Sequence, residues 1–227
     1  MKEVLYGKHA VSHAFRAKRR KFFRLFLPKN SESAEAHLVE LARQQKIPIV
    51  RSAPQQEMSL EVSSYPYVSF DELKNKKFIL ILDEIQDPQN LGALCRSAHI
   101  FGVEGVLIAD SHASPVTPAA VHTSVGATEY LEIARVSSIA QCLEQLKEEG
   151  FWIYGADAEA SKTIFEEKFP SKVVLVIGSE EKGMKRLVRE RCDILLKIPS
   201  VRGEIGSLNA SAAGAILLCE IARQRKI

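Results

Sequence analysis

Three groups of polar residues each follow an apolar run of the chain, and their side chains can bind a polar ligand or position a reacting hydroxyl. Their polar members are Asn90, Arg96, Glu180, Ser207 and Asn209. Amides and carboxylates orient hydroxyl groups, and a guanidinium binds phosphate or carboxylate. Since the order of apolar run, glycine or polar residues and then helix recurs three times, we expect one site assembled from three strand ends.

The first group precedes and enters a predicted helix. Asn90 and Arg96 are six residues apart, nearly two helical turns, so both can face one side of the helix start. A guanidinium held there suits phosphate or carboxylate recognition. The alternative is a structural ion pair of Arg96 with Asp83 or Glu84.

The second group is a loop from Gly178 to Gly183 that contains Glu180 and Glu181. Its glycines allow the backbone to approach a ligand and to adopt positive φ. The loop lacks the G-x-x-x-x-G-K-[ST] pattern of a phosphate-binding loop, and its acidic residues argue against a phosphate cradle. It suits a ligand with hydroxyl, amine or adenine donors.

The third group opens a long apolar helix that we expect at about residues 210–223. Ser207 at a helix start is ordinarily an N-cap. Asn209 and Ser211 crowd the same turn, however, and supply more polar groups than capping needs.

The elements around these groups alternate between strand and helix from residue 78 onward. Continuous apolar runs predict strands at residues 78–82, 105–109, 130–136, 151–156, 173–177 and 194–198. Helical patterns lie at residues 91–101, 118–124, 139–149, 184–191 and 209–225. This alternation predicts a mainly parallel sheet covered on both faces, with ligands beyond the carboxyl ends of its strands.

The preceding part of the chain predicts a small α/β unit over residues 1–52. Its clearest element is a helix over residues 8–17, with Ala10, Val11, Ala14 and Phe15 on one face. Prolines and polar residues interrupt residues 53–77, which we interpret as a linker to a second domain over residues 78–227.

Positive charge concentrates in this first part. Residues 1–70 hold 12 Lys and Arg against 6 Asp and Glu, although the whole chain has a net charge of only +3. Arg19, Arg20 and Lys21 form the densest run. Clustered cations are typical of a surface that contacts the phosphates of a nucleic acid, and a merely solvated face is the alternative.

Composition excludes several other classes of protein. The 227 residues are 46% hydrophobic and 26% charged, as in an ordinary globular protein. No apolar run is long enough to cross a membrane, and the first residues lack the pattern of a secretory signal. The four cysteines are scattered, without metal-ligand spacing, which favours a reduced protein of the cytoplasm that binds no metal.

The three groups together resemble the SpoU/TrmH family of RNA ribose 2′-O-methyltransferases, within the SPOUT superfamily. The resemblance rests on Asn90-x-Gly92-x-x-x-Arg96, on Gly178-x-Glu180-x-x-Gly183, and on Ile198-Pro199 followed by Ser207-Leu208-Asn209-x-Ser211-x-Ala213. It covers residues 78–225. The beginning, Leu5-Tyr6-Gly7-Lys8-His9-Ala10-Val11, is similar to the substrate-binding domain of the RlmB-like branch.

This resemblance implies a sheet with a C-terminal trefoil knot, an obligate homodimer with its site at the interface, and S-adenosylmethionine as methyl donor without a metal. It implies that Asn90, Arg96, Glu180, Ser207 and Asn209 form the catalytic set. It further implies that Gly178, Ile198 and Leu208 hold the cofactor. Arg96 would act as the base or, more easily for a guanidinium that stays protonated, as a phosphate clamp.

The expected reaction is methylation of a ribose 2′-oxygen in structured RNA, with rRNA favoured over tRNA by analogy with the N-terminal domain. The alternatives are a tRNA methyltransferase and an RNA-binding protein that retains the fold without turnover. A nucleotide-binding oxidoreductase is disfavoured because no G-x-G-x-x-G occurs. The chain departs from the family at Ser200, where a Met is usual, and at Glu181, where Gly is frequent.

Overall fold

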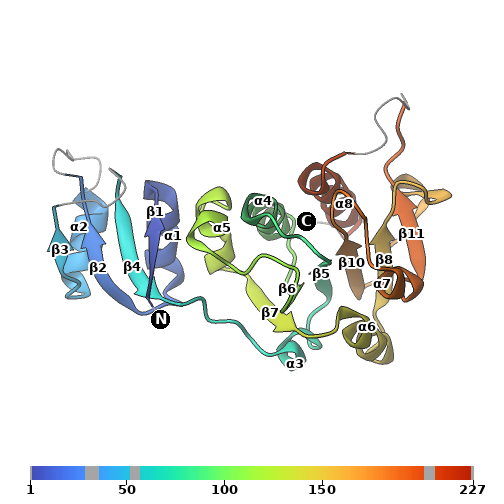
Figure 1. Cartoon of the computed structure of the whole chain (residues 1–227), viewed down its shortest axis with the longest axis horizontal. Coiled ribbons are helices and arrows are strands. Elements are labelled where there is room, and N and C mark those ends of the chain that lie inside the picture. Colours follow the sequence, from blue (N-terminus) through green and yellow to red (C-terminus); the bar gives the residue numbers. More distant parts are fainter. Residues whose placement is uncertain (1, 29–35, 52–56, 202–207, 226–227) are drawn as a thin grey trace.

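A computed structural model describes residues 2–28, 36–51, 57–201 and 208–225. Its first part is a four-stranded sheet in the order β1-β4-β2-β3. The strands are β1 (Lys2–Tyr6), β2 (Phe22–Phe26), β3 (Ile49–Val50) and β4 (Ser59–Ser63), and two helices, α1 (Lys8–Ala17) and α2 (Ala36–Gln44), accompany them (Figure 1).

Helix α1 occupies the residues that the sequence predicts. Its four predicted apolar residues are buried, and Lys18 ends it in the left-handed conformation with φ 52°. Strand β4 was not predicted, because it lies within the expected linker. It pairs antiparallel with both β1 and β2, so the linker prediction is wrong for residues 59–63. The first unit therefore reaches at least Ser63.

The second part is a parallel seven-stranded sheet in the order β7-β6-β5-β10-β8-β11-β9. Its strands are β5 (Phe78–Leu82), β6 (Gly105–Ala109), β7 (Glu132–Val136), β8 (Trp152–Ala156), β9 (Lys162–Thr163), β10 (Val173–Ile177) and β11 (Ile194–Lys197). All but β9 match predicted runs. Every residue of β5, β6 and β10 is buried, as expected for strands covered on both faces.

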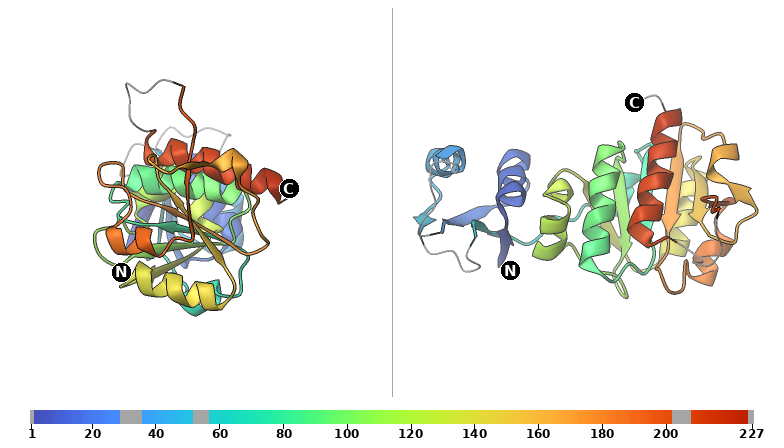
Figure 2. Two further views of the ribbon diagram at one scale, coloured as in Figure 1. Left: turned by 90° about the vertical axis from the view of Figure 1, so that its right-hand side faces the viewer. Right: turned by 90° about the horizontal axis from the view of Figure 1, so that it is seen from above.

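Helices cover both faces of this sheet, as Figure 2 shows in its left view. One layer holds α4 (Pro88–Ile100), α5 (Pro118–Thr123) and α8 (Ala210–Gln224). The other holds α3 (Phe70–Leu73), α6 (Ile139–Glu148) and α7 (Arg186–Glu190). Short 3₁₀ turns, η2 (Ala127–Glu129) and η3 (Ile164–Glu166), complete the fold. The prediction of an α/β protein with a mainly parallel sheet is confirmed.

Helices α4 and α8 approach each other closely at Gly214. A Cβ atom built there would lie 2.3 Å from Cδ2 of Leu94 and 2.8 Å from Cδ1 of Ile177. Since any larger residue would push these elements apart, Gly214 fixes how α8 lies over β10.

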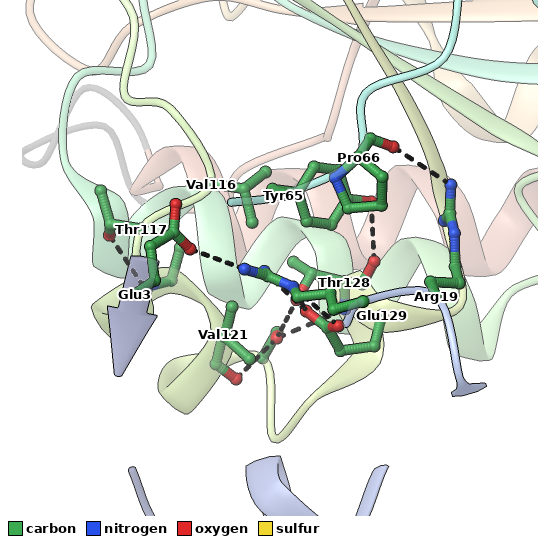
Figure 3. Close-up of polar contacts among 12 residues, drawn as sticks. Glu3, Arg19, Tyr65, Pro66, Val116, Thr117, Val121, Thr128 and Glu129 are labelled. Carbon is green, nitrogen blue, oxygen red and sulfur yellow. Dashed lines mark hydrogen bonds and ion pairs between the residues drawn. The ribbon is translucent and has the colours of Figure 1, made fainter. Parts of the chain in front are cut away.

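A buried ion pair joins the two parts of the chain. The Arg20 side chain is fully buried, and its Nη2 lies 2.8 Å from Oε1 of Glu129, which is 1% exposed. Arg20 Nη1 also lies 2.6 Å from Oε2 of Glu3; Figure 3 labels both carboxylate partners, Glu3 and Glu129. Tyr65 donates its hydroxyl hydrogen toward the carbonyls of Thr128 and Leu131, each at 2.8 Å.

This junction corrects the interpretation of the basic run. Arg20 faces inward and its guanidinium is taken up by two carboxylates, so it does not face an RNA. Arg19 donates to the carbonyl of Leu131 and to that of Pro66, the second of which Figure 3 shows. Lys21 is exposed. Of the three basic residues, Arg19 and Arg20 thus contact the domain junction, and Lys21 lies on the surface. Among the described helices, none has the length and apolar character of a membrane span.

Candidate functional site

The carboxyl ends of β5, β10 and β11 bring the predicted polar groups together. Asn90 Nδ2, in the first turn of α4, donates to Glu180 Oε1 at 3.1 Å. The backbone N–H of Ala210, the first residue of α8, donates to the same oxygen at 3.1 Å. One carboxylate oxygen therefore ties together the three segments that the sequence predicted would meet.

Asn209 is the N-cap of α8. Its Oδ1 accepts from the backbone N–H of Ala212 at 2.7 Å and from the hydroxyl of Ser211 at 3.2 Å. These contacts account for the polar crowding at this helix start. Ser207, the other predicted residue of this turn, lies outside the described residues.

The loop after β10 folds back on itself. The backbone groups of Ser179 and Gly183 exchange hydrogen bonds of 3.0 and 2.9 Å, and Gly183 has a φ of 66°. A Cβ atom on Gly178 would lie 2.2 Å from the carbonyl carbon of Gly183 and from the backbone nitrogen of Met184. Only glycine therefore fits at position 178 in this loop conformation.

Asp83 fastens the end of this loop to β5. Its Oδ2 accepts from the backbone N–H of Lys185 at 2.7 Å, and Glu84 forms an ion pair with the Lys185 side chain at 3.3 Å. Burial raises the pKa of Asp83 above its ordinary value. Both acids that the sequence offered as partners of Arg96 are thus engaged with Lys185, and the structural ion-pair interpretation of Arg96 is wrong.

A cavity of about 1200 Å³ opens beside these groups. We call it the strand-end cavity; the predicted residues Gly178, Glu180, Ile198 and Leu208 all line it. Apolar side chains, among them Leu196 and Leu217, supply much of its wall. Its size and mixed lining suit a ligand with both an apolar ring and polar groups.

The cavity also contains residues that the sequence analysis missed. Asp157 and Glu159 follow β8, and Arg189 of α7 donates from Nε to Asp157 Oδ2 at 2.7 Å. The sequence could have indicated Asp157 as a site residue, because it directly follows a predicted apolar strand, as Asp83 does. Only the strand order, which places β8 between β10 and β11, shows that this end belongs to the same site.

Arg96 stands apart from the other predicted catalytic residues. It is exposed on α4 and does not line the strand-end cavity. Within the described part of the chain it has no hydrogen bond or ion pair. Its Cα lies about 9 Å along the helix axis from that of Asn90, from the rise of 1.5 Å per residue. The same described residues contain no group of three or more His, Cys, Asp or Glu placed to hold a metal ion.

Comparison with known proteins agrees with both parts of the fold. The sequence model described as "SpoU rRNA Methylase family" matches residues 77–219. The one described as "RNA 2'-O ribose methyltransferase substrate binding" matches residues 4–65. Fold and site define the class as an RNA methylase built on a parallel α/β sheet. The chain belongs to the SpoU rRNA methylase family, so the resemblance seen in its three motifs is confirmed.

Individual relatives span nearly the whole chain. A Bacillus subtilis protein, YacO, named for the TrmH family of tRNA/rRNA methyltransferases, is 36% identical over 98% of this chain and 96% of its own length. The crystal structure of the SpoU methyltransferase AviRb from Streptomyces viridochromogenes, in complex with the cofactor AdoMet, has a TM-score of 0.86. It is 26% identical, and the match covers 99% of this chain and 90% of that one.

Proposed function

We propose that this protein transfers a methyl group from S-adenosylmethionine to a ribose 2′-oxygen of RNA, with rRNA favoured over tRNA. The observation that carries the proposal is the meeting of Asn90, Glu180 and the α8 N-terminus beside the strand-end cavity. Membership of the SpoU family and the AdoMet complex of the AviRb relative support it.

The residues of the strand-end cavity fit this cofactor chemically. Ile198 and Leu208 offer apolar contact for an adenine ring, and the glycine at position 178 leaves backbone groups open to close approach. Carboxylates at Asp157 and Glu159 suit a ligand with hydroxyl donors and positive charge. When bound, the cofactor supplies an electrophilic methyl group.

The protein's own groups would orient the RNA and stabilise charge. Glu180 holds the Asn90 amide in place through one oxygen, which leaves the amide carbonyl free to orient a hydroxyl. Arg96 would clamp an RNA phosphate and stabilise the ribose oxygen as the hydroxyl proton passes to water. Its exposed guanidinium, which has no partner among the described residues, suits that role better than that of a base, because arginine stays protonated in proteins.

We further propose that the active protein is a homodimer. Arg96 does not reach the strand-end cavity of its own chain, so the catalytic set is incomplete in one protomer. The outer side of α8 carries a shallow apolar hollow of about 310 Å³ lined by Phe165, Ala215, Ile216 and Cys219. Phe165 is 60% exposed and Ile216 36%. A second copy of this chain would cover these side chains.

Within this proposal the first unit, now including β4, recognises RNA and residues 78–227 carry the reaction. We also propose the C-terminal trefoil knot of the superfamily. Its support is helix α8, which packs against α4 and whose first backbone N–H donates to Glu180 in the loop after β10. All four cysteines are free, which suits the cytoplasm, where RNA substrates occur.

The test is a methylation assay with tritiated S-adenosylmethionine and separated rRNA and tRNA. We expect label in rRNA, in dinucleotides that resist alkaline hydrolysis because their 2′-oxygen is blocked. Label on bases alone would refute ribose methylation, and label confined to tRNA would overturn the substrate preference. A folded protein that binds no S-adenosylmethionine by calorimetry would favour the RNA-binding protein without turnover.

Sedimentation tests the dimer separately. We expect twice the chain mass of 25.2 kDa, and we expect Ile216→Arg to give a folded monomer without methylation activity. Leu187→Arg, at an apolar side chain 52% exposed on α7, is the matched control and should leave the dimer intact. A monomer with full activity would refute the proposal.

A further inference from the structure

A row of rings crosses the junction between α1 and the helix layer of α4. His13 Nδ1 of α1 lies 2.9 Å from the hydroxyl of Tyr130, which follows η2. The His99 ring of α4 stacks on the Tyr130 ring, with centroids 5.1 Å apart and planes at 21°. His13 meets Tyr130 edge-on, with centroids 5.6 Å apart. Three elements from both parts of the chain thus share one aromatic cluster.

One fixed cation, Arg16, and two further histidines lie near His13 in this cluster. His9 and Arg16 lie four residues before and three residues after His13, so all three lie on one side of α1. Burial and then the charges of Arg16, His9 and His99 lower the pKa of His13, which shows that these groups lie near one another. Helix α1 contains no acidic residue.

The acidic residues nearest to Tyr130 in sequence do not offset this charge at the surface. Glu129 is buried and paired with Arg20. Glu132 forms an ion pair with Lys76 at 2.7 Å. The surface around Tyr130 therefore presents exposed ring faces and cations without a free carboxylate among these neighbours. Tyr130 is 37% exposed, and His9, Arg16 and His99 are exposed as well.

We propose that His9, His13, Arg16, His99 and Tyr130, the α1–α4 surface, bind a single RNA strand next to the nucleotide to be methylated. This inference rests on the proposed function and specifies where its substrate lies. Bases of a single strand stack on aromatic faces, and a guanidinium binds the phosphates between them.

The position of this surface on α4 supports the assignment. His99 lies three residues after Arg96, so the two residues lie on neighbouring positions of one helix face, about 4.5 Å apart along the axis. A strand held at Tyr130 and His99 therefore adjoins the guanidinium assigned to the phosphate clamp. Recognition by the first unit and methylation by the second then act on one continuous stretch of RNA.

The other basic and aromatic surface of the first unit is a weaker candidate. Lys2 Nζ of β1 lies 4.6 Å from the centre of the Phe23 ring of β2, and the Arg24 guanidinium lies 5.7 Å from the centre of the Phe26 ring. These rings are already covered by the protein's own cations, so a base would have to displace them before stacking. The Tyr130 ring carries no such cation from the described part of the chain: His99 stacks on it, His99 is itself exposed, and Tyr130 stays 37% exposed.

The experiment measures binding of a fluorescein-labelled single-stranded RNA of about 12 nucleotides by anisotropy. We expect Tyr130→Ala to weaken binding about tenfold, from the stacking energy of one base, and Tyr130→Phe to stay near wild type. Arg16→Ala should weaken binding and reduce the slope of log affinity against log salt by about 1. Trp152→Ala, at an aromatic residue 50% exposed at the start of β8, is the matched control and should change nothing.

Calorimetry with S-adenosylmethionine on the same variants separates this inference from the proposed function. Unchanged cofactor affinity with weakened RNA binding supports the α1–α4 surface. If the wild type methylates RNA while Tyr130→Ala and Arg16→Ala bind the probe as tightly as the wild type, the α1–α4 surface is not the RNA site. The proposed methylation of RNA is then unaffected. Loss of affinity in Tyr130→Phe equal to that in Tyr130→Ala would refute stacking.

Discussion

Replacing Arg20 by methionine removes one partner of the buried ion pair at the domain junction. The guanidinium contacts Glu129 through three hydrogen bonds of 2.8 to 3.1 Å and Glu3 through one of 2.6 Å. Arg20→Met leaves the Glu129 carboxylate without this partner in a site where its side chain is 1% exposed. The stability lost in Arg20→Met is therefore the cost of a buried charge without its partner, which is larger than the cost of breaking an exposed ion pair.

The expected cost is about 3–5 kcal/mol, the usual effect of breaking a buried pair from one side. That is a large part of a typical total stability of about 5–15 kcal/mol. For a chain of this length, each kcal/mol lowers the melting temperature by about 2–4 °C, so we expect a decrease of about 6–20 °C. The double variant Arg20→Met/Glu129→Met should lose less than Arg20→Met alone, because it strands no charge.

The pH dependence gives a second measure. Burial already raises the pKa of Glu129, and the Arg20 charge opposes that shift, so Arg20→Met should raise this pKa further. The folded state then binds the proton more tightly than the unfolded state does. Stability of Arg20→Met should therefore fall as the pH rises from the ordinary glutamate value of 4.5 through the folded pKa.

Urea denaturation followed by circular dichroism, at several pH values, measures both effects. A cost below about 1 kcal/mol for Arg20→Met would show that the pair behaves as an exposed one, against its burial. If the double variant loses as much stability as the two single variants together, the cost does not come from an unpaired buried charge and the argument is refuted. A stability that rises with pH would contradict the sign derived for Glu129.

Four further predictions concern the site, the dimer and a buried thiol. Gly178→Ala should lower affinity for S-adenosylmethionine in calorimetry while the protein stays folded, because its Cβ would collide with Gly183 and displace the loop. Asn209→Ala removes the N-cap of α8 and should cost about 1 kcal/mol in urea denaturation; no change would mean that another group caps the helix. Cys219 is exposed on α8, so its reaction with Ellman's reagent should slow as rising protein concentration forms the dimer. Cys95 should stay unreactive at pH 8 until the chain unfolds, because burial raises its pKa to about 12.

The sequence predicted the elements of the second part well because each strand is a continuous apolar run between turn residues. It missed β4 because Ser59-Leu60-Glu61-Val62-Ser63 is a short alternating strand next to prolines and glutamines that resemble a linker. Such a strand is stabilised mainly by pairing with β1 and β2, which no local pattern reveals.

The sequence predicted those residues of the candidate site that come directly after a predicted strand. Asn90, Glu180 and the N-terminus of α8 meet there as expected. The inward position of Arg20 was not predictable, because its partner Glu129 lies 109 residues away in the chain. A basic run looks the same in sequence whether its members face solvent or a distant carboxylate. The strand order, which adds Asp157 to the site, is likewise a property of tertiary pairing.

The strand order also sets when the site can form during synthesis. Strand β5 pairs with β10 on one side, yet the ribosome makes β6, β7 and β8 before β10. Asn90 is made early, but its hydrogen-bond partner Glu180 and the α8 N-terminus come much later. A nascent chain can therefore complete its first unit, with β1, β2 and β4 paired, well before it has any cofactor site. The cofactor site can form only after β10 and α8 have been made. A chain truncated before them therefore keeps the first unit but lacks the site for methylation.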